Sequence, residues 1–530
     1  MSNMIETLQY TTRLVKMWGQ SRLSDGKKLS EALTLSGIPF WDAFAVEMAR
    51  IYVPAALSAD AAPSVITQTI RPYLIRAKYG FRDFVRNRRS TQGCFLWPAG
   101  KTILCLDFSE HMSRDVLQPL VTHLTKQKGI KVVSVRDKSW SNASGCSHKN
   151  SLYQTVWAHW DQQTILKLSK MRQELYRIES DLRASNDLMN IIRDVDRSIL
   201  TQLENVFNLF FRVYLPLLLP QAVVAQHILA NHRPSIVISP DVADPRTRFY
   251  TLLCRQTGIP CLEVQFGLTG AEGIEWQFFS ADNVAVWGEN SKKAMIKHCI
   301  PEEKIIITGS PRHDCLVNVS DEEVKSMRAK LGVSNGSALV LLASAYQLHS
   351  YDEYSNPELL NTMKRSVFEA ADKTPGICLL VKPHPVENVR ETRTLAGKYK
   401  NIIFVPQKSD ICELTRICDA FISFGSTATV DALICGKFVI CPIFPGWIWS
   451  DLFKKTGATH VPNSTEEVLE TFRLIANGAY ISVKSKLEAA RHDFLAHWIH
   501  RADGLATDRI TELALQMAQM KICKNNSMSD

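Results

Sequence analysis

The sequence lacks the cysteine pattern of a disulfide-bonded or zinc-binding protein. Its 13 cysteines are scattered singly, without a Cys-x-x-Cys pair or a cysteine and histidine grouping at zinc-ligand spacing. An odd number of scattered thiols favours reduced, mostly buried cysteines and a cytosolic protein. We therefore expect no metal site of this kind.

Long uninterrupted apolar runs are also missing. The first thirty residues mix charged and apolar side chains and lack the apolar core of a signal peptide. The most apolar window, 206–229, is interrupted by Arg212, Pro216 and Pro220, so we do not expect it to span a membrane. Any membrane contact should be peripheral. The expected location is the cytoplasm, with the inner face of the plasma membrane as the alternative.

No compositional bias indicates disorder, since 45% of the residues are hydrophobic and 22% are charged. A chain of 530 residues is too long for one ordinary core, which predicts two or three domains. The net charge of +9 favours an anionic ligand or surface without identifying either. Because no RNA-binding or DNA-binding module is recognisable, nucleic acid is not an expected partner.

Two stretches of the chain alternate short apolar strands with helical segments, which predicts parallel α/β units. The first stretch has strands at 102–107, 131–135, 235–239, 261–265, 283–286 and 304–308. The second has strands at 338–342, 378–381, 402–405, 420–423 and 438–441. A helical region from about 152 to 232 interrupts the first. The predicted fold class is α/β, with two Rossmann-like domains facing a cleft and a helical N-terminal extension.

The expected domains follow from these patterns. They are a helical, basic extension at 1–95, a first Rossmann-like domain at 96–312, a second at 313–480, and C-terminal helices at 481–530 that pack across both. The end of the extension, Arg71–Arg89, interleaves basic residues with aromatics. One interpretation is a solvated helix face above packed aromatics. The other is docking onto anionic lipid headgroups.

Polar residues follow the strand at 378–381, in the sequence Lys382-Pro383-His384-Pro385. The two prolines stiffen the loop that presents His384. A histidine there can donate a hydrogen bond to a phosphate oxygen, and Lys382 can add a positive charge. A structural histidine would be the alternative explanation if this motif stood alone.

A second polar group ends the strand at 420–423, where Ser423 is followed by Phe424-Gly425-Ser426-Thr427. Gly425 allows a tight turn, and Ser426 or Thr427 can cap the next helix. The first N–H groups of such a helix bind phosphate well, although ordinary caps look the same. Ligands of open α/β sheets lie at the carboxyl ends of the strands, so the two motifs predict one shared phosphate site.

These motifs resemble those of bacterial GT-B glycosyltransferases of surface-polysaccharide synthesis. The group includes capsule polysaccharide transferases, CDP-glycerol glycerophosphotransferases, and more distant sialyl-transferases, Kdo-transferases and UDP-N-acetylglucosamine 2-epimerases. The resemblance rests on 382–385, on 423–427 with 431–433 and 436–437, and on 307–314, within residues 96 to 520.

The resemblance implies that the second domain holds the donor nucleotide. His384, Ser423, Ser426 and Thr427 would contact the donor phosphates, and Asp431 would face the ribose. A solvated helix residue is the alternative for Asp431. Arg312, at the predicted domain junction, can reach a donor phosphate, although an ordinary linking turn also explains its surroundings.

The catalytic base is less defined. Relatives commonly have Gln-His-Gly where this chain has Gln265-Phe266-Gly267, so a histidine is missing there. Inverting transfer needs a base for the acceptor hydroxyl. Each candidate near a strand end of the first domain can also be a cap, a turn residue or a solvated group. One of the following is expected to act: Asp107, Glu110, His111 or Asp241.

The predicted function is transfer of a sugar from a nucleotide-sugar donor to a lipid-linked acceptor in surface-polysaccharide synthesis. The nucleotide sugar is a co-substrate based on CMP, CDP or UDP, and no cofactor or metal is expected. Lys382, His384 and a positive helix end would stabilise the departing nucleotide. The alternatives are a non-hydrolysing nucleotide-sugar epimerase and a noncatalytic scaffold of polysaccharide assembly.

Overall fold

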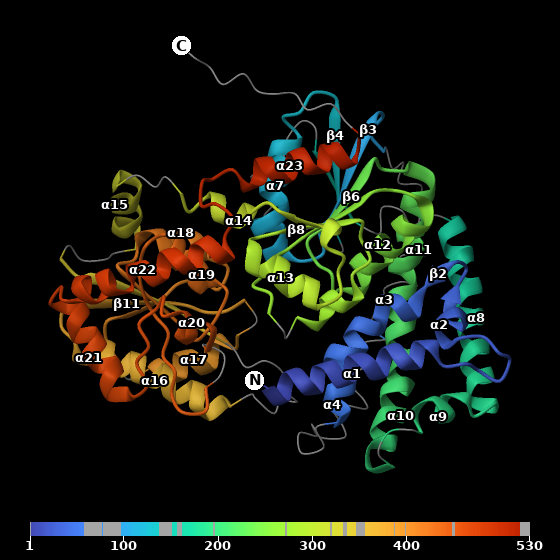
Figure 1. Cartoon of the computed structure of the whole chain (residues 1–530), viewed down its shortest axis with the longest axis horizontal. Helices are drawn as coiled ribbons and strands as arrows, with labels where there is room; N and C mark the ends of the chain where they lie inside the picture. Colours follow the sequence, from blue (N-terminus) through green and yellow to red (C-terminus); the bar gives the residue numbers. More distant parts are fainter. Residues whose placement is uncertain are drawn as a thin grey trace. The chain divides into compact units, whose positions relative to one another are not determined.

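The computed structural model divides the chain into two compact units (Figure 1). Unit 1 comprises residues 1–286, 291–308 and 507–530, and unit 2 comprises 287–290 and 309–506. The structure describes residues 2–57, 77, 97–136, 151–155, 162–193, 195, 197–270, 273–317, 321–331, 336–345, 356–385, 387–397, 399–447 and 451–519. Apart from Ala77, the basic segment Arg71–Arg89 lies outside these residues.

Unit 1 contains a seven-stranded parallel sheet in the order β5-β4-β3-β6-β7-β8-β9. The strands are β3 Lys101–Leu106, β4 Ile130–Arg136, β5 Ser151–Thr155, β6 Ile236–Ser239, β7 Cys261–Val264, β8 Asn283–Val286 and β9 Ile305–Ile307. The strand order reverses between β3 and β6, so ligands are expected beside the carboxyl ends of these two strands. β5 begins where the sequence predicted helix, and that prediction was wrong.

Some helices of unit 1 lie near this sheet. Others belong to the N-terminal layer or to the long helical region after β5. Those near the sheet are α6 Glu110–Met112, α7 Gln118–Leu124, α12 Pro245–Thr257, α13 Glu289–Lys297 and α23 Ala506–Met517. The N-terminal layer contains α1 Ser2–Gln20, α2 Leu29–Ala32, the hairpin β1 Thr34–Leu35 and β2 Ile38–Pro39, α3 Phe40–Glu47 and α4 Val53–Leu57. The later helices are α8 Gln162–Ala184, α9 Asp187–Ile192, α10 Leu200–Leu209 and α11 Leu215–His232.

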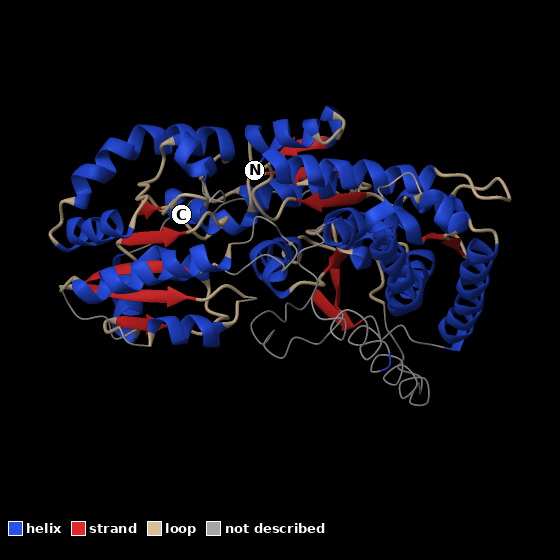
Figure 2. Cartoon of the chain, turned by 90° about the horizontal axis from the view of Figure 1, so that it is seen from below, coloured by secondary structure: helices blue, strands red, loops and turns tan. Residues whose placement is uncertain are grey.

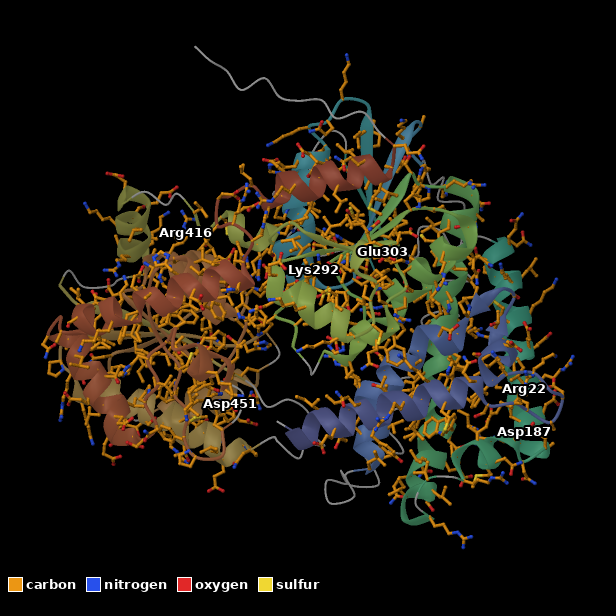
Figure 3. The ribbon with its side chains drawn as sticks, in the orientation of Figure 1. Arg22, Asp187, Lys292, Glu303, Arg416 and Asp451 are labelled. Atoms are coloured by element: carbon orange, nitrogen blue, oxygen red, sulfur yellow. The ribbon has the colours of Figure 1, made fainter. Side chains whose placement is uncertain are left out.

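The described part of the N-terminal extension, residues 2–57, shares a core with the rest of unit 1. The ring of Trp18 lies 5.3 Å from that of Phe207, and the ring of Phe40 lies 5.1 Å from that of Phe249. Asp187, labelled in Figure 3, accepts hydrogen bonds from the backbone and hydroxyl of Ser24 at 2.9 and 2.7 Å. The extension is therefore continuous with the first domain in its packing.

Among the described residues, one helical run, Leu200–His232, is long and apolar enough to cross a membrane. Its most apolar window has a mean hydropathy of 1.5, and 61% of that window is buried inside the protein. Phe207, Phe210, Leu219 and Ile228 are among the residues that it contributes to the unit 1 core. The run is thus part of the unit 1 core.

Unit 2 contains a five-stranded parallel sheet in the order β12-β11-β10-β13-β14. Its strands are β10 Ala338–Ala343, β11 Ile377–Lys382, β12 Ile402–Phe404, β13 Ala420–Ser423 and β14 Phe438–Ile440. Figure 2 shows helices along both faces of this sheet. The helices of unit 2 are α14 Pro311–Asp314, α15 Asp321–Lys330, α16 Pro357–Lys373, α17 Val389–Ala396, α18 Ile411–Ile417, α19 Ala428–Ile434, α20 Asp451–Thr456, α21 Thr465–Ala476 and α22 Tyr480–Trp498. The order reverses at β10, which makes its carboxyl end the expected ligand position.

The C-terminal helices divide between the units. α22 lies in unit 2, whereas nearly all of α23 lies in unit 1, where Ile510 and Leu515 join the apolar cluster that contains Ile103 and Leu120. The first domain closes at Thr308, before the predicted boundary, because α14 with Arg312 packs within unit 2.

Candidate functional site

The two predicted phosphate motifs lie at the same edge of the unit 2 sheet. Ala343, the last residue of β10, pairs with Lys382 on one side and with Ser423 on the other. The two polar strand ends are therefore level with each other and separated by one strand. Neighbouring strands are about 4.8 Å apart, so both motifs can contact one phosphorylated ligand.

The loop after β11 is fixed by side chains as well as by its prolines. The buried Lys382 ammonium donates to the Pro383 carbonyl at 2.9 Å. The backbone N–H of the half-buried His384 donates to Glu387 Oε2 at 2.8 Å, and its carbonyl accepts from Gln407 Nε2 at 2.6 Å. Both His384 backbone groups are thus held by residues that the sequence analysis did not single out.

The turn after β13 is organised by Ser423. Its hydroxyl oxygen accepts from the N–H groups of Gly425 and Ser426 at 3.2 and 3.0 Å and lies 3.1 Å from the Ser426 hydroxyl. Gly425 has a φ of +100°, a conformation that favours glycine, as the motif predicted. Thr427 occupies the N-cap position of α19, but its side chain makes no capping bond. The predicted hydroxyl cap was wrong because Ser423 closes the turn instead.

Asp431 and Arg312 form a buried ion pair within unit 2. Arg312 Nε lies 3.0 and 3.1 Å from the two carboxylate oxygens, and a terminal guanidinium nitrogen makes a further bond to Oδ2. The exposed fractions of the two side chains are 7% and 0%. Asp431 was expected to face the donor ribose, and Arg312 to reach a donor phosphate. The structure pairs the two side chains with each other, and their contact with a nucleotide stays a prediction.

His313 completes this cluster. Its ring is buried and lies edge-on to that of Trp287, with 4.6 Å between the centroids. Burial, together with the neighbouring Arg312 charge, lowers the pKa of His313 to about 3. The imidazole is therefore neutral near pH 7 and adds no charge to the ion pair.

Two candidate bases of unit 1 are already bound to protein groups. Asp107, at the end of β3, is paired with Arg136 of β4, and burial raises its pKa despite the arginine. Asp241, after β6, accepts from the backbone N–H groups of Ala243 and Asp244 at 2.9 and 3.2 Å. Burial and the charge of Asp244 raise the pKa of Asp241 to about 6.

The other two candidates, Glu110 and His111, lie exposed on the short helix α6. His111 Nδ1 lies 3.0 Å from the Ser109 hydroxyl oxygen. Its ring is 5.1 Å from the ring of Phe266, in an edge contact. The fold thus brings an imidazole from another strand end next to the position where relatives commonly have a histidine.

Two further acids of unit 1, Glu263 and Glu47, were not predicted from the sequence. Burial and the nearby Asp241 raise the pKa of Glu263, on β7, to about 8. Burial and the nearby Asp244 raise the pKa of Glu47, at the end of α3, to about 8. The signal for Glu263 was present in the sequence, since a single acid interrupts the apolar strand Cys261–Val264.

Across the described ranges, no group of three or more histidine, cysteine, aspartate or glutamate side chains is placed to hold a metal ion. In unit 2 the groups of the candidate site are mainly cations, hydroxyls and N–H donors.

Comparison with known families gives one match. Residues 278–434 match the model of the CDP-Glycerol:Poly(glycerophosphate) glycerophosphotransferase family. This segment includes every motif assigned to the donor site, from Arg312 to Asp431. The match confirms the resemblance inferred from the motifs, and the family is one of transferases. None of the curated proteins matches the chain.

Solved structures share the fold at low sequence identity. The S. aureus MnaA-UDP co-structure aligns with a TM-score of 0.51 and 13% identity over 81% of this chain and 100% of that chain. A UDP-N-acetylglucosamine 2-epimerase aligns with a TM-score of 0.51 and 13% identity over 82% of this chain and 100% of that chain. Together with the two parallel sheets, these similarities confirm the predicted α/β fold with two Rossmann-like domains of the GT-B class.

Proposed function

We propose that this protein transfers a sugar from a nucleotide-sugar donor to an acceptor hydroxyl in surface-polysaccharide synthesis. The observation that best supports the proposal is the register of Lys382 and Ser423 on the two sides of β10. Both residues lie at the strand-order reversal and inside the segment that matches a transferase family. Their motifs offer cationic, hydroxyl and N–H groups to a nucleotide phosphate.

In this proposal the acceptor oxygen attacks the anomeric carbon of the donor sugar, and the hydroxyl proton passes to a base. The bond from the anomeric carbon to the phosphate oxygen breaks, and the nucleotide leaves with the electron pair. His384, Lys382 and the N–H groups at the start of α19 stabilise the resulting negative charge. The donor nucleotide is CMP, CDP or UDP.

We propose His111 as the base among the four candidates. Its ring is exposed and is oriented by Ser109, whereas Asp107 is engaged by Arg136 and Asp241 by backbone N–H groups. A general base must first lie within hydrogen-bond reach of the acceptor hydroxyl, and only then does its pKa matter. The exposed imidazole of His111 meets this condition best. The ring contact with Phe266 supports the same assignment.

The acceptor is proposed to be lipid-linked, so the enzyme works in the cytoplasm at the inner face of the plasma membrane. Peripheral contact through Arg71–Arg89 would hold it there, although that segment lies outside the described residues. A long acceptor anchored in a membrane explains why a basic, aromatic segment would accompany a transferase.

A nucleotide-sugar epimerase is the second candidate because a solved 2-epimerase shares the fold. The two activities differ in their need for an acceptor. Incubation with UDP-N-acetylglucosamine alone should leave the donor sugar unchanged if the protein is a transferase. An epimerised nucleotide sugar would reverse the ranking.

The primary experiment combines a nucleotide-binding panel with a variant of His384. Thermal shifts with CMP, CDP, UDP, GDP and dTDP should identify one stabilising nucleotide. His384→Ala should weaken its binding and lower transfer by about 10²- to 10³-fold, because a donor to the leaving phosphate is lost. His492→Ala, an exposed histidine on α22, is the matched control and should behave like the wild type. Failure of the wild-type protein to bind any nucleotide would favour the scaffold alternative.

A further inference from the structure

We infer that Glu387 and Lys364 form a buried clamp that positions His384 for nucleotide binding. The inference rests on the proposed function and adds a positioning residue that no motif indicated. Glu387 lies between β11 and α17, three residues after His384, and Lys364 lies on α16. Their side chains are 3% and 4% exposed, and Lys364 Nζ lies 2.6 Å from Glu387 Oε1.

One oxygen of the Glu387 carboxylate is bound to the body of unit 2. Oε1 accepts hydrogen bonds from the Ser344 hydroxyl at 2.7 Å, the Lys364 ammonium at 2.6 Å and the Thr392 hydroxyl at 2.5 Å. These donors come from the end of β10, from α16 and from α17. Three donors from three elements fix the carboxylate in position and orientation.

The other oxygen acts on the histidine loop. Oε2 accepts from the His384 N–H at 2.8 Å, and the Glu387 N–H donates to the His384 carbonyl at 3.0 Å. Gln407 Nε2 donates to the same carbonyl and to that of Glu387, at 2.6 and 3.0 Å. Glu387 thus holds the backbone of His384 through both its own backbone and its side chain.

The network also links this loop to the centre of the sheet. The Ser344 N–H donates to the Lys382 carbonyl at 3.0 Å, while the Ser344 hydroxyl binds Glu387. Ser344 directly follows β10, the strand between the two phosphate motifs. The clamp therefore fixes the position of His384 relative to the carboxyl end of β10, the strand that lies between the two phosphate motifs.

A buried ion pair is a poor way to gain stability alone. Removing two charges from water has a large desolvation cost, and well-packed apolar side chains of similar volume often stabilise a protein as much or more. An apolar pair could not accept the hydrogen bond that the His384 N–H donates to Glu387 Oε2. The geometry therefore points to positioning as the role of Glu387.

The test uses a double-mutant cycle with the full-length protein. Glu387→Met combined with Lys364→Met replaces both charges with apolar side chains of similar length, so that no lone charge stays buried. In the wild-type background this pair should weaken binding of the stabilising nucleotide by about 10- to 100-fold. In the His384→Ala background the same pair should have no further effect, because the residue through which the clamp acts is gone.

The matched control is Glu369→Met with Lys373→Met, an exposed pair of the same residue types on the same helix, which should bind nucleotide as the wild type does. An equal loss of affinity in both backgrounds, or no loss in either, would overturn the inference. Hydrogen exchange at the His384 amide gives a readout that needs no nucleotide, and it should be faster in the double-methionine variant. Unchanged exchange refutes the clamp, whereas the absence of nucleotide binding by the wild type refutes the proposed function.

Discussion

The two sheets share a parallel strand order with one reversal, yet two acids near the carboxyl edge of one sheet differ in their surroundings from two acids near that of the other. In unit 2, Glu387 and Asp431 each contact a buried cation, Lys364 or Arg312. In unit 1, burial raises the pKa of Asp241 to about 6 and that of Glu263 to about 8. Acids neutralised by cations leave the unit 2 edge suited to an anion, whereas unit 1 carries groups that exchange protons near neutral pH.

The strongest test of this difference between the units is His111→Gln in unit 1. If unit 1 supplies the base and unit 2 the nucleotide site, kcat should fall by about 10²- to 10⁴-fold while nucleotide affinity stays unchanged. Steady-state transfer and nucleotide titration measure the two quantities separately. His227→Gln is the control, because His227 contacts Asn231 on α11, the helix that leads into the amino end of β6 rather than away from a carboxyl end. A wild-type kcat in His111→Gln would remove His111 as the base.

A smaller effect is expected on stability from breaking the buried ion pair of unit 2. Asp431→Asn leaves the Arg312 guanidinium buried without its counter-charge and should destabilise unit 2 by about 3–5 kcal/mol. Asp107→Asn in unit 1 should cost less, because one carboxylate oxygen makes the pair there and burial already raises the pKa of Asp107. Hydrogen exchange of peptides from β13–α19 and from β3–β4 reports each unit separately. The reverse order of the two losses would contradict the comparison.

An effect of pH on stability is expected in unit 1. The pKa of Glu263 is raised from 4.5 to about 8, so between these values the folded protein binds a proton that the unfolded chain has lost. The unfolding free energy should therefore fall as pH rises, by at most about 1.4 kcal/mol per pH unit from this group. Glu263→Gln should remove this contribution, and its advantage over the wild type should grow from pH 5 to pH 8. Urea unfolding across that range measures the effect, and a constant difference would show that Glu263 is not the group responsible.

Many of the strands could be predicted from local patterns of apolar and polar residues. The strands Asn283–Val286 and Ala420–Ser423 have the predicted bounds, since each is a short apolar run ended by polar or glycine residues. β5 was missed because Ser151–Thr155 is short, ends in the polar pair Gln154-Thr155 and lies at the start of an expected helical region. Its strand character comes from pairing with β4, which no local pattern encodes.

The candidate site was predictable where residues are close in sequence, as for Lys382 with His384 and Ser423 with Gly425. Partners far apart in sequence were not. Arg312 and Asp431 are 119 positions apart, and Lys364 and Glu387 are 23 apart. The sequence shows that such residues are polar, but only the packed structure shows which of them neutralise one another.

The path of the chain through the two units has a consequence for synthesis. Unit 1 takes its last helix, α23, from residues that follow the whole of unit 2, and Ile510 and Leu515 of that helix complete an apolar cluster beside β3. A ribosome makes these residues after all of unit 2, so the core of unit 1 stays incomplete while unit 2 is being translated. A nascent chain truncated after residue 308 would expose that apolar surface, so unit 1 can complete its core only once α23 has been made.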